Sequence, residues 1–177
     1  MTCIAGLEHR GKVYLAGDSA GVSGWARTIR ADTKVFTLGD YVFGFTSSFR
    51  MGQLLRYSLH IRTPDTWDID RFMATDFIDA VRKTLKDGGY ARTKEGAEEA
   101  GTFLVGVQGA LYGIHSDYQI ARSCDGIAAV GCGADLALGS LWTTRDRTDP
   151  QERLRLALDA AVHFSAGVAG PVWQESA

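Results

Sequence analysis

Residues 1–21 read MTCIAGLEHRGKVYLAGDSAG, and this stretch decides the expected fold. Two short apolar runs, at residues 2–7 and 12–18, flank the turn-like tetrapeptide EHRG, a pattern that is typical of a β-hairpin. Thr2 directly follows the initiator methionine, which is usually removed when a small residue comes next. We therefore expect a first strand that begins with a residue carrying both a free α-amine and a hydroxyl group.

The rest of the chain alternates between blocks of strands and pairs of helices. We expect strands at residues 34–38 and 41–45, joined by a turn at Gly39-Asp40, and at residues 102–108, 110–116, 118–123, 126–131 and 171–175. Apolar residues spaced by three or four predict helices at 49–59 and 68–86, and a further helix at 134–142. Asp149 and Pro150 are typical of the start of a last helix. The glycine-rich residues 17–25 and the polar residues 87–101 are expected to be exposed loops.

This order of elements predicts an α+β fold. Helices grouped between blocks of strands favour two antiparallel sheets stacked face to face with helices on the outer sides, a four-layer αββα sandwich. We find no internal repeat, no low-complexity segment and no linker. We therefore expect residues 1–177 to form a single domain.

Composition argues against several classes of function. The net charge of −2 and the isoelectric point near 6.1 give no electrostatic case for binding nucleic acid or an anionic membrane. We see no secretory signal and no apolar stretch long enough to span a bilayer. The three cysteines have no metal-ligand spacing, and their odd number argues against a disulfide framework. We expect a cytoplasmic protein with no metal and no cofactor.

Three residues near the start could together perform nucleophilic catalysis. A free amine on Thr2 could take the proton of the Thr2 hydroxyl, because the ordinary pKa of an α-amine, about 7.7–8.0, lies close to working pH. Lys34, steadied by Asp18, could favour the neutral form of that amine by its charge. Taken alone, Asp18 is more typical of a turn acid and Lys34 of an edge-strand lysine reaching to water.

The pattern T-x-I-A-G, then A-G-D-S, then T-K-V-F resembles the start of proteasome β-type subunits, and more so of bacterial HslV-type peptidases. This resemblance to N-terminal-nucleophile hydrolases places Thr2, Asp18 and Lys34 on the family's catalytic positions. It continues more weakly through GFTSSF, at residues 44–49, and VGCGADLALGSL, at residues 130–141. It implies that Thr2 attacks a peptide carbonyl and that backbone N–H groups near Ser47 and Ser48 hold the oxyanion, with Ser47 favoured.

The chain departs from the family pattern in two places. Cys132 replaces the serine of the family's G-S-G turn, so a weaker hydrogen-bond partner would support the Thr2 amine. The proteasome motif D-x-x-S-G is replaced by His163-Phe-Ser-Ala-Gly, which lacks the acid and its serine, as HslV-type enzymes do. For His163 we expect a position at a helix end, where an imidazolium suits the helix dipole.

The resemblance implies a threonine-type peptidase that works as a homo-oligomeric ring on peptides or unfolded proteins, with an ATP-dependent unfoldase as a possible partner. Two alternatives stay open. The first is a hydrolase of small amides on the same fold, which would also use Thr2. The second is a catalytically inactive scaffold, which retention of Met1 would favour because Thr2 would then have no free amine.

Overall fold

The computed structural model describes residues 1–65 and 67–177. Its strands form two main antiparallel sheets, with the strand orders β12-β1-β2-β13 and β11-β10-β9-β6-β5. The first sheet consists of β1 (Cys3–His9), β2 (Lys12–Gly17), β12 (Ile127–Gly131) and β13 (Trp173–Ser176). The second consists of β5 (Val35–Leu38), β6 (Tyr41–Phe45), β9 (Phe103–Val107), β10 (Ala110–Ile114) and β11 (Ile120–Arg122).

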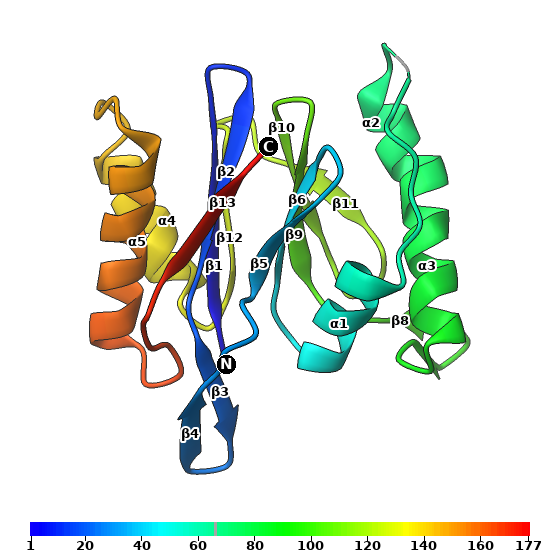
Figure 1. Ribbon diagram of the computed structural model, residues 1–177, viewed down its shortest axis with the longest axis horizontal. Coiled ribbons are helices and arrows are strands. Elements are labelled where there is room, and N and C mark those ends of the chain that lie inside the picture. The colour runs from blue at the N-terminus through cyan, green and yellow to red at the C-terminus, as the bar shows by residue number, and fades with distance from the viewer. Residues whose placement is uncertain (66) are drawn as a thin grey trace.

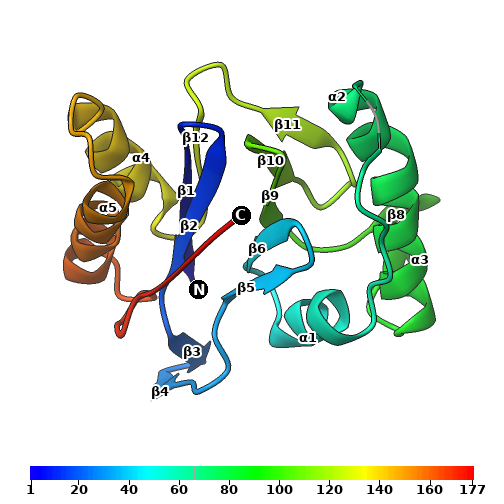
Figure 2. The ribbon, with the colours of Figure 1, turned by 45° about the horizontal axis from the view of Figure 1, so that its top comes forward.

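The two sheets face each other, and helices lie on their outer sides (Figure 1). Helices α4 (Ala134–Thr143) and α5 (Pro150–Phe164) lie beside the first sheet, and α1 (Phe49–Tyr57) and α3 (Ile78–Asp87) lie beside the second. The view in Figure 2 shows the same separation of the two helical groups. The predicted α+β class with antiparallel sheets is therefore confirmed.

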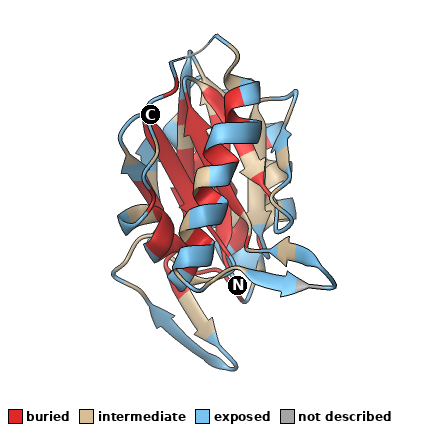
Figure 3. Ribbon diagram, turned by 90° about the vertical axis from the view of Figure 1, so that its right-hand side faces the viewer, coloured by how far each residue is buried: buried red, intermediate tan, exposed pale blue. Residues whose placement is uncertain are grey.

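The apolar residues divide into three buried clusters, which match this arrangement. The cluster between the sheets is made of Ile4, Val13, Leu15, Val35, Val42, Leu104 and Leu111. A second cluster joins the first sheet to α4 and α5, and a third, the largest, joins the second sheet to α1 and α3. Figure 3 shows buried residues on the inward strands and helix faces and exposed residues on the outer helix faces. Burial of apolar surface on both sides of each sheet holds the layers together.

The predicted hairpin at the start of the chain is present. Strands β1 and β2 pair in antiparallel register, with Gly6 opposite Leu15. A Cβ atom on Gly6 would lie 2.4 Å from a methyl group of Leu15, so a glycine here makes room for the core. The hairpin is paired on both sides, by β12 next to β1 and by β13 next to β2.

Each predicted helix forms, with local differences at its ends. Ser48 caps α1 by accepting a hydrogen bond from the Arg50 N–H, and Asp149 caps α5 in front of Pro150. The helix predicted for residues 68–86 starts as α2 (Ile69–Phe72), passes through a π-helical turn at Met73–Phe77 and continues as α3.

Two segments predicted to be loops contain short strands instead. Residues 17–25 contribute β3 (Ala20–Ser23), which pairs with β4 (Ala26–Ile29) in a hairpin that projects beyond the sheets. Residues 87–101 contain a second hairpin of β7 (Arg92–Lys94) and β8 (Ala97–Glu99). Both predictions failed for the same reason, since strands of three or four residues with few apolar side chains carry no clear alternating pattern. Within the described residues, no helix is both long and apolar enough to cross a membrane.

Candidate active site

Thr2 lies directly before β1, at the end of the first sheet where β1 meets the turn after β12. Its side chain is buried, with 5% of the residue exposed. The Thr2 carbonyl accepts a hydrogen bond from the Gly133 N–H at 3.4 Å. A Cβ atom on Gly131, whose φ is +99°, would lie 2.2 Å from the same carbonyl oxygen. Only glycine therefore lets this turn approach Thr2 so closely.

Asp18 directly follows β2 and is completely buried. Its Oδ1 accepts a hydrogen bond from the Cys3 N–H at 3.0 Å. Its Oδ2 accepts from the N–H groups of Ala20, at 3.0 Å, and Ala169, at 3.3 Å. Three backbone donors from separate parts of the chain thus compensate for the burial of the carboxylate, so Asp18 is both a turn acid and a partner for a buried cation.

Lys34 lies one residue before β5, rather than within that strand as the sequence suggested. Its carbonyl accepts from the Phe45 N–H at 3.0 Å, which holds the backbone against β6. The side chain points inward and is 1% exposed. The interpretation of Lys34 as an edge-strand lysine reaching to water is therefore wrong.

The Lys34 ammonium joins Asp18 to Thr2. Nζ donates to Asp18 Oδ1 at 2.8 Å and to Thr2 Oγ1 at 2.9 Å. Burial lowers the pKa of Lys34 below its ordinary value, and the charge and hydrogen bond of Asp18 oppose that shift. Asp18 therefore favours the charged lysine, which places a positive charge on the Thr2 hydroxyl.

Ser47 and Ser48 lie in the turn between β6 and α1, and their N–H groups differ. The Ser48 N–H donates to the Thr46 carbonyl at 2.7 Å. The Ser47 backbone has a φ of +64°, and its hydroxyl accepts from the Thr102 N–H at 3.0 Å. Among the described residues, the Ser47 N–H has no protein acceptor. Of the two serines, Ser47 is thus the one with a backbone donor available to a ligand.

These residues surround a small pocket of about 80 Å³ beside Thr2. The pocket is lined by Met1, Thr2, Ala20, Val22, Lys34, Phe45, Thr46, Ser47, Ser48 and Phe49. Four of the six residues selected from the sequence, Thr2, Lys34, Ser47 and Ser48, line this pocket, and Asp18 supports Lys34 from behind. The sixth residue, Cys132, contacts Thr2 but is not part of the pocket lining.

Cys132 contacts the backbone of Thr2. Its sulfur accepts a hydrogen bond from the Thr2 N–H at 3.3 Å and lies 3.5 Å from the Thr2 carbonyl oxygen, to which the thiol donates. Cys132 is nevertheless an exposed residue. His163 lies in the last turn of α5, as predicted, and its ring packs against Phe164.

Met1 decides whether Thr2 has a free amine. While Met1 is in place, the nitrogen of Thr2 belongs to a peptide bond, and the Thr2 hydroxyl donates to the Met1 carbonyl. The Met1 side chain is 62% exposed and lies beside Gly167, where an added Cβ atom would come within 2.6 Å of it. Removal of Met1 would therefore expose the Thr2 nitrogen without disturbing the core.

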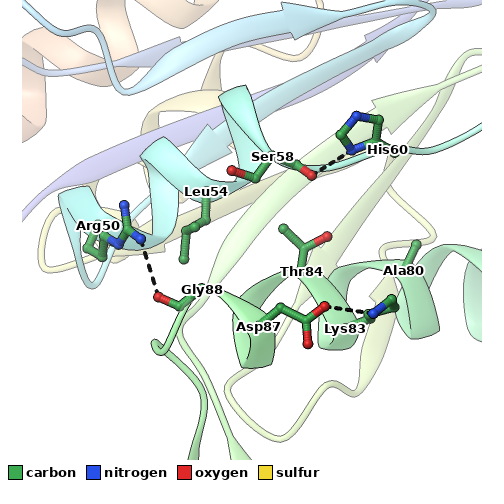
Figure 4. Close-up of a pocket in the computed structure, with 9 residues that line it drawn as sticks. All are labelled: Arg50, Leu54, Ser58, His60, Ala80, Lys83, Thr84, Asp87 and Gly88. Atoms are coloured by element: carbon green, nitrogen blue, oxygen red, sulfur yellow. Dashed lines mark hydrogen bonds and ion pairs between the residues drawn. The ribbon is translucent and has the colours of Figure 1, made fainter.

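A larger groove lies elsewhere, between α1 and α3 (Figure 4). It has a volume of about 460 Å³ and includes Arg50, His60, Lys83 and Asp87. These polar groups are engaged locally, since Lys83 pairs with Asp87 and Arg50 donates to the Gly88 carbonyl. Among the described residues that line the groove, Ser58 and Thr84 carry hydroxyl groups, but His60 contacts the Ser58 backbone carbonyl and no hydroxyl, so the size of the groove does not make it the better catalytic candidate.

Sequence reasoning did not select Cys3, Ser165 or Ala169, which also support the site. Cys3 and Ala169 supply N–H groups to Asp18, and Ser165 donates to the Cys132 sulfur at 3.5 Å. A backbone donor carries no signal in the sequence. Ser165 lies within the segment that replaces the proteasome motif D-x-x-S-G, but at a different position in it.

Comparison with solved structures identifies the fold. BPH from Thiobacillus denitrificans, in complex with epoxomicin, matches with a TM-score of 0.82 and 19% identity, covering 99% of this chain and 98% of that one. HslV from Trypanosoma brucei matches with a TM-score of 0.71 and 18% identity, covering 99% and 98%. Anbu (ancestral beta-subunit) from Yersinia bercovieri matches with a TM-score of 0.70 and 10% identity, covering 99% and 81%. No protein-family model and no curated protein matches the sequence.

The chain thus has the fold of the N-terminal-nucleophile hydrolases. More particularly, it has the fold that HslV, Anbu and BPH share, which are proteasome-type members of that class. The resemblance predicted from the first residues is confirmed at the level of the fold.

Proposed function

We propose that this protein is a threonine-type peptidase of the proteasome and HslV family. The observation that carries the proposal is the buried contact of Lys34 Nζ with both Asp18 Oδ1, at 2.8 Å, and Thr2 Oγ1, at 2.9 Å. A cation on a buried hydroxyl favours its deprotonated form, which is the form that attacks a carbonyl. The residue that carries this hydroxyl is also the second residue of the chain, where removal of Met1 would create the base.

In the proposed reaction, the free amine of Thr2 takes the proton from Oγ1, directly or through one water molecule. Oγ1 attacks the peptide carbonyl carbon, and the Ser47 N–H receives the developing oxyanion. The amine returns the proton to the leaving nitrogen, which gives an ester between Oγ1 and the acyl group. Water then hydrolyses the ester. A backbone donor of this kind lowers the barrier by roughly 3–4 kcal/mol in other enzymes.

We extend the proposal to the organisation of the protein. Residues 1–177 would form one domain whose helix, sheet, sheet and helix layers correspond to the four-layer sandwich of this family. The family resemblance implies a homo-oligomeric ring that hides the site, peptides or unfolded proteins as substrates, and an ATP-dependent unfoldase as a possible partner. A cytoplasmic location agrees with three free thiols.

A second candidate is a hydrolase of small amides. It is favoured by the small pocket beside Thr2, whose volume is about 80 Å³ while Met1 is still part of the lining. It would use the same nucleophile and the same cation. A third possibility, an inactive scaffold, would require that Met1 stays in place.

The test combines mass spectrometry with a peptide epoxyketone, which reacts with a threonine that has both a free amine and a hydroxyl. We expect the purified protein to lack one methionine residue and to form an adduct that is absent in Thr2→Ala. Cleavage of unfolded casein would support the peptidase, and turnover of small amides alone would support the second candidate. An intact Met1 with no adduct would rule out both enzymes.

A further inference from the structure

The hydroxyl group of Ser165 begins a chain of contacts that ends on the Thr2 nitrogen. Ser165 Oγ donates to Cys132 Sγ at 3.5 Å, and this sulfur accepts the Thr2 N–H at 3.3 Å. The thiol also donates to the Thr2 carbonyl, at 3.5 Å. The sulfur of Cys132 therefore contacts both backbone polar atoms of the candidate nucleophile.

The backbone is held in place at both Ser165 and Cys132. Ser165 is the C-cap of α5, where its N–H donates to the Ala161 carbonyl at 2.9 Å and its carbonyl accepts from the Val168 N–H at 3.1 Å. Cys132 is held between two glycines that pack closely. A Cβ atom on Gly133 would lie 2.8 Å from the Cβ atom of Cys3.

We propose that Ser165 is a positioning residue that acts through the Cys132 sulfur on the Thr2 nitrogen. This inference rests on the proposed function, in which that nitrogen becomes the base amine once Met1 is removed. The amine takes the hydroxyl proton only when its lone pair faces Oγ1. Its N–H groups must then be held by another acceptor, and the Cys132 sulfur lies within hydrogen-bond distance of this nitrogen.

The Ser165 hydroxyl matters because a thiol is a weak and poorly directional partner. With the S–H directed at the Thr2 carbonyl, the lone pairs of sulfur are left for two donors. The Ser165 hydroxyl donates to one lone pair of the sulfur, and the other lone pair remains to accept a hydrogen bond from the amine. A serine in place of Cys132 would bind the amine more strongly by itself, so the cysteine makes this site dependent on a second hydroxyl group.

The first experiment measures kcat, KM and the rate of epoxyketone adduct formation in three single variants. We expect Ser165→Ala to lower kcat and the adduct rate on the order of tenfold with KM unchanged, because the amine is misoriented while substrate contacts persist. Ser165→Thr, which keeps the hydroxyl, should retain most of the activity. Cys132→Ser should raise the adduct rate, because a hydroxyl group binds the amine more strongly than the thiol does.

Non-additivity distinguishes positioning from a structural role. In a Cys132→Ala background, Ser165→Ala should cause no further loss of activity, because the contacts that link Ser165 to Thr2 through the sulfur are already absent. Equal losses in both backgrounds, with an equal fall in the melting temperature, would overturn the inference. So would wild-type kinetics in Ser165→Ala.

A thiol reagent gives an independent readout on the same chain of contacts. In a Cys124→Ser background, methyl methanethiosulfonate should form a disulfide with Cys132, with methanesulfinate leaving, and block adduct formation at Thr2. Cys3 should not compete, because it is buried and its pKa is raised to about 12. The Cys124→Ser/Cys132→Ser variant, which lacks the thiol, is the matched control, and its adduct rate should be the same with and without the reagent. Full adduct formation after Cys132 is blocked would contradict the inference.

The adduct experiments distinguish an error in the role of Ser165 from an error in the proposed function. If the unchanged protein lacks Met1 but forms no adduct, the proposed function is wrong and the inference falls with it. If the unchanged protein forms the adduct and Ser165→Ala forms it equally fast, only the inference is wrong.

Discussion

Two lysine–aspartate pairs of similar length lie in opposite surroundings. Lys34 and Asp18 are 2.8 Å apart, with side chains that are 1% and 0% exposed. Lys83 and Asp87 are 2.6 Å apart on α3, with side chains that are 77% and 62% exposed. The exposed pair borders the groove of about 460 Å³, whereas the buried lysine borders the pocket of about 80 Å³. Neither a short ion pair nor a large cavity is therefore sufficient by itself to identify the candidate active site.

Burial is what separates the two regions. The exposed pair joins neighbouring turns of one helix, where water competes with the contact and the net stabilisation is small. The buried pair joins segments on two different sheets, and three backbone N–H groups complete the solvation of Asp18. Water cannot take the place of the Lys34 charge at this buried position, so loss of the lysine should affect both folding and chemistry.

The strongest test of this contrast replaces each lysine by methionine. Lys34→Met leaves the Asp18 carboxylate buried without its cation, so we expect a loss of about 3–5 kcal/mol in the free energy of unfolding and no adduct at Thr2. Lys83→Met, the matched control, should change stability by about 0.5 kcal/mol or less and keep the activity. Urea unfolding and adduct formation measure both effects. Equal stability of the two variants would mean that the buried pair contributes no more than the exposed one.

A glycine in each region tests how closely the backbone is packed. Gly131→Ala would force a Cβ atom to within 2.2 Å of the Thr2 carbonyl oxygen at a φ of +99°. We expect a loss of about 2–3 kcal/mol and a displaced, inactive Thr2. Gly88→Ala, beside the groove, meets a Leu54 methyl group at 2.4 Å with an ordinary φ of −78°. That side chain can move, so this variant should be less destabilised and should still react with the epoxyketone.

The pH dependence of stability provides a third comparison, between a buried and an exposed cysteine. Burial, with a further contribution from Asp18, raises the pKa of Cys3 from 9.0 to about 12. Between these two values the unfolded chain loses the thiol proton while the folded chain keeps it, so the free energy of unfolding falls as pH rises. This group contributes a slope of up to about 1.4 kcal/mol per pH unit.

Cys3→Ala should therefore make the alkaline loss of stability less steep, as measured by urea unfolding at pH 9, 10 and 11. Cys124→Ala, which removes an exposed thiol, is the control and should keep the slope of the unchanged protein. An unaltered slope in Cys3→Ala would show that the buried thiol does not contribute to it.

The smallest effect is expected at the helix that borders both regions. Ser48→Ala removes the side-chain cap of α1 and should lower the free energy of unfolding by about 1 kcal/mol. Turnover and adduct formation should persist, because the Ser47 N–H, not the Ser48 side chain, is the proposed donor to the oxyanion. A complete loss of adduct formation in this variant would instead place Ser48 in the reaction.

Much of this site could be predicted because its chemistry lies in the first part of the chain. Thr2, Asp18 and Lys34 combine distinct residue types with recognisable neighbours, and the hairpin and the helices follow from their apolar periodicity. The short hairpins β3–β4 and β7–β8 could not be predicted in this way, since strands of three or four residues are stabilised by pairing that the local pattern does not reveal.

The sequence by itself determined which groups are available: a nucleophile behind one methionine, a lysine, an acid, and the helices and strands that carry them. Only the tertiary structure decided that these groups meet, that Lys34 is buried, and that Ser165 reaches Thr2 through Cys132. The physical reason is that local patterns depend on near neighbours, whereas these contacts join residues that are 16 positions apart, as between Asp18 and Lys34, or more than a hundred, as between Thr2 and Cys132. Packing of the two sheets and of α5 brings such residues together, and that packing is a property of the whole chain.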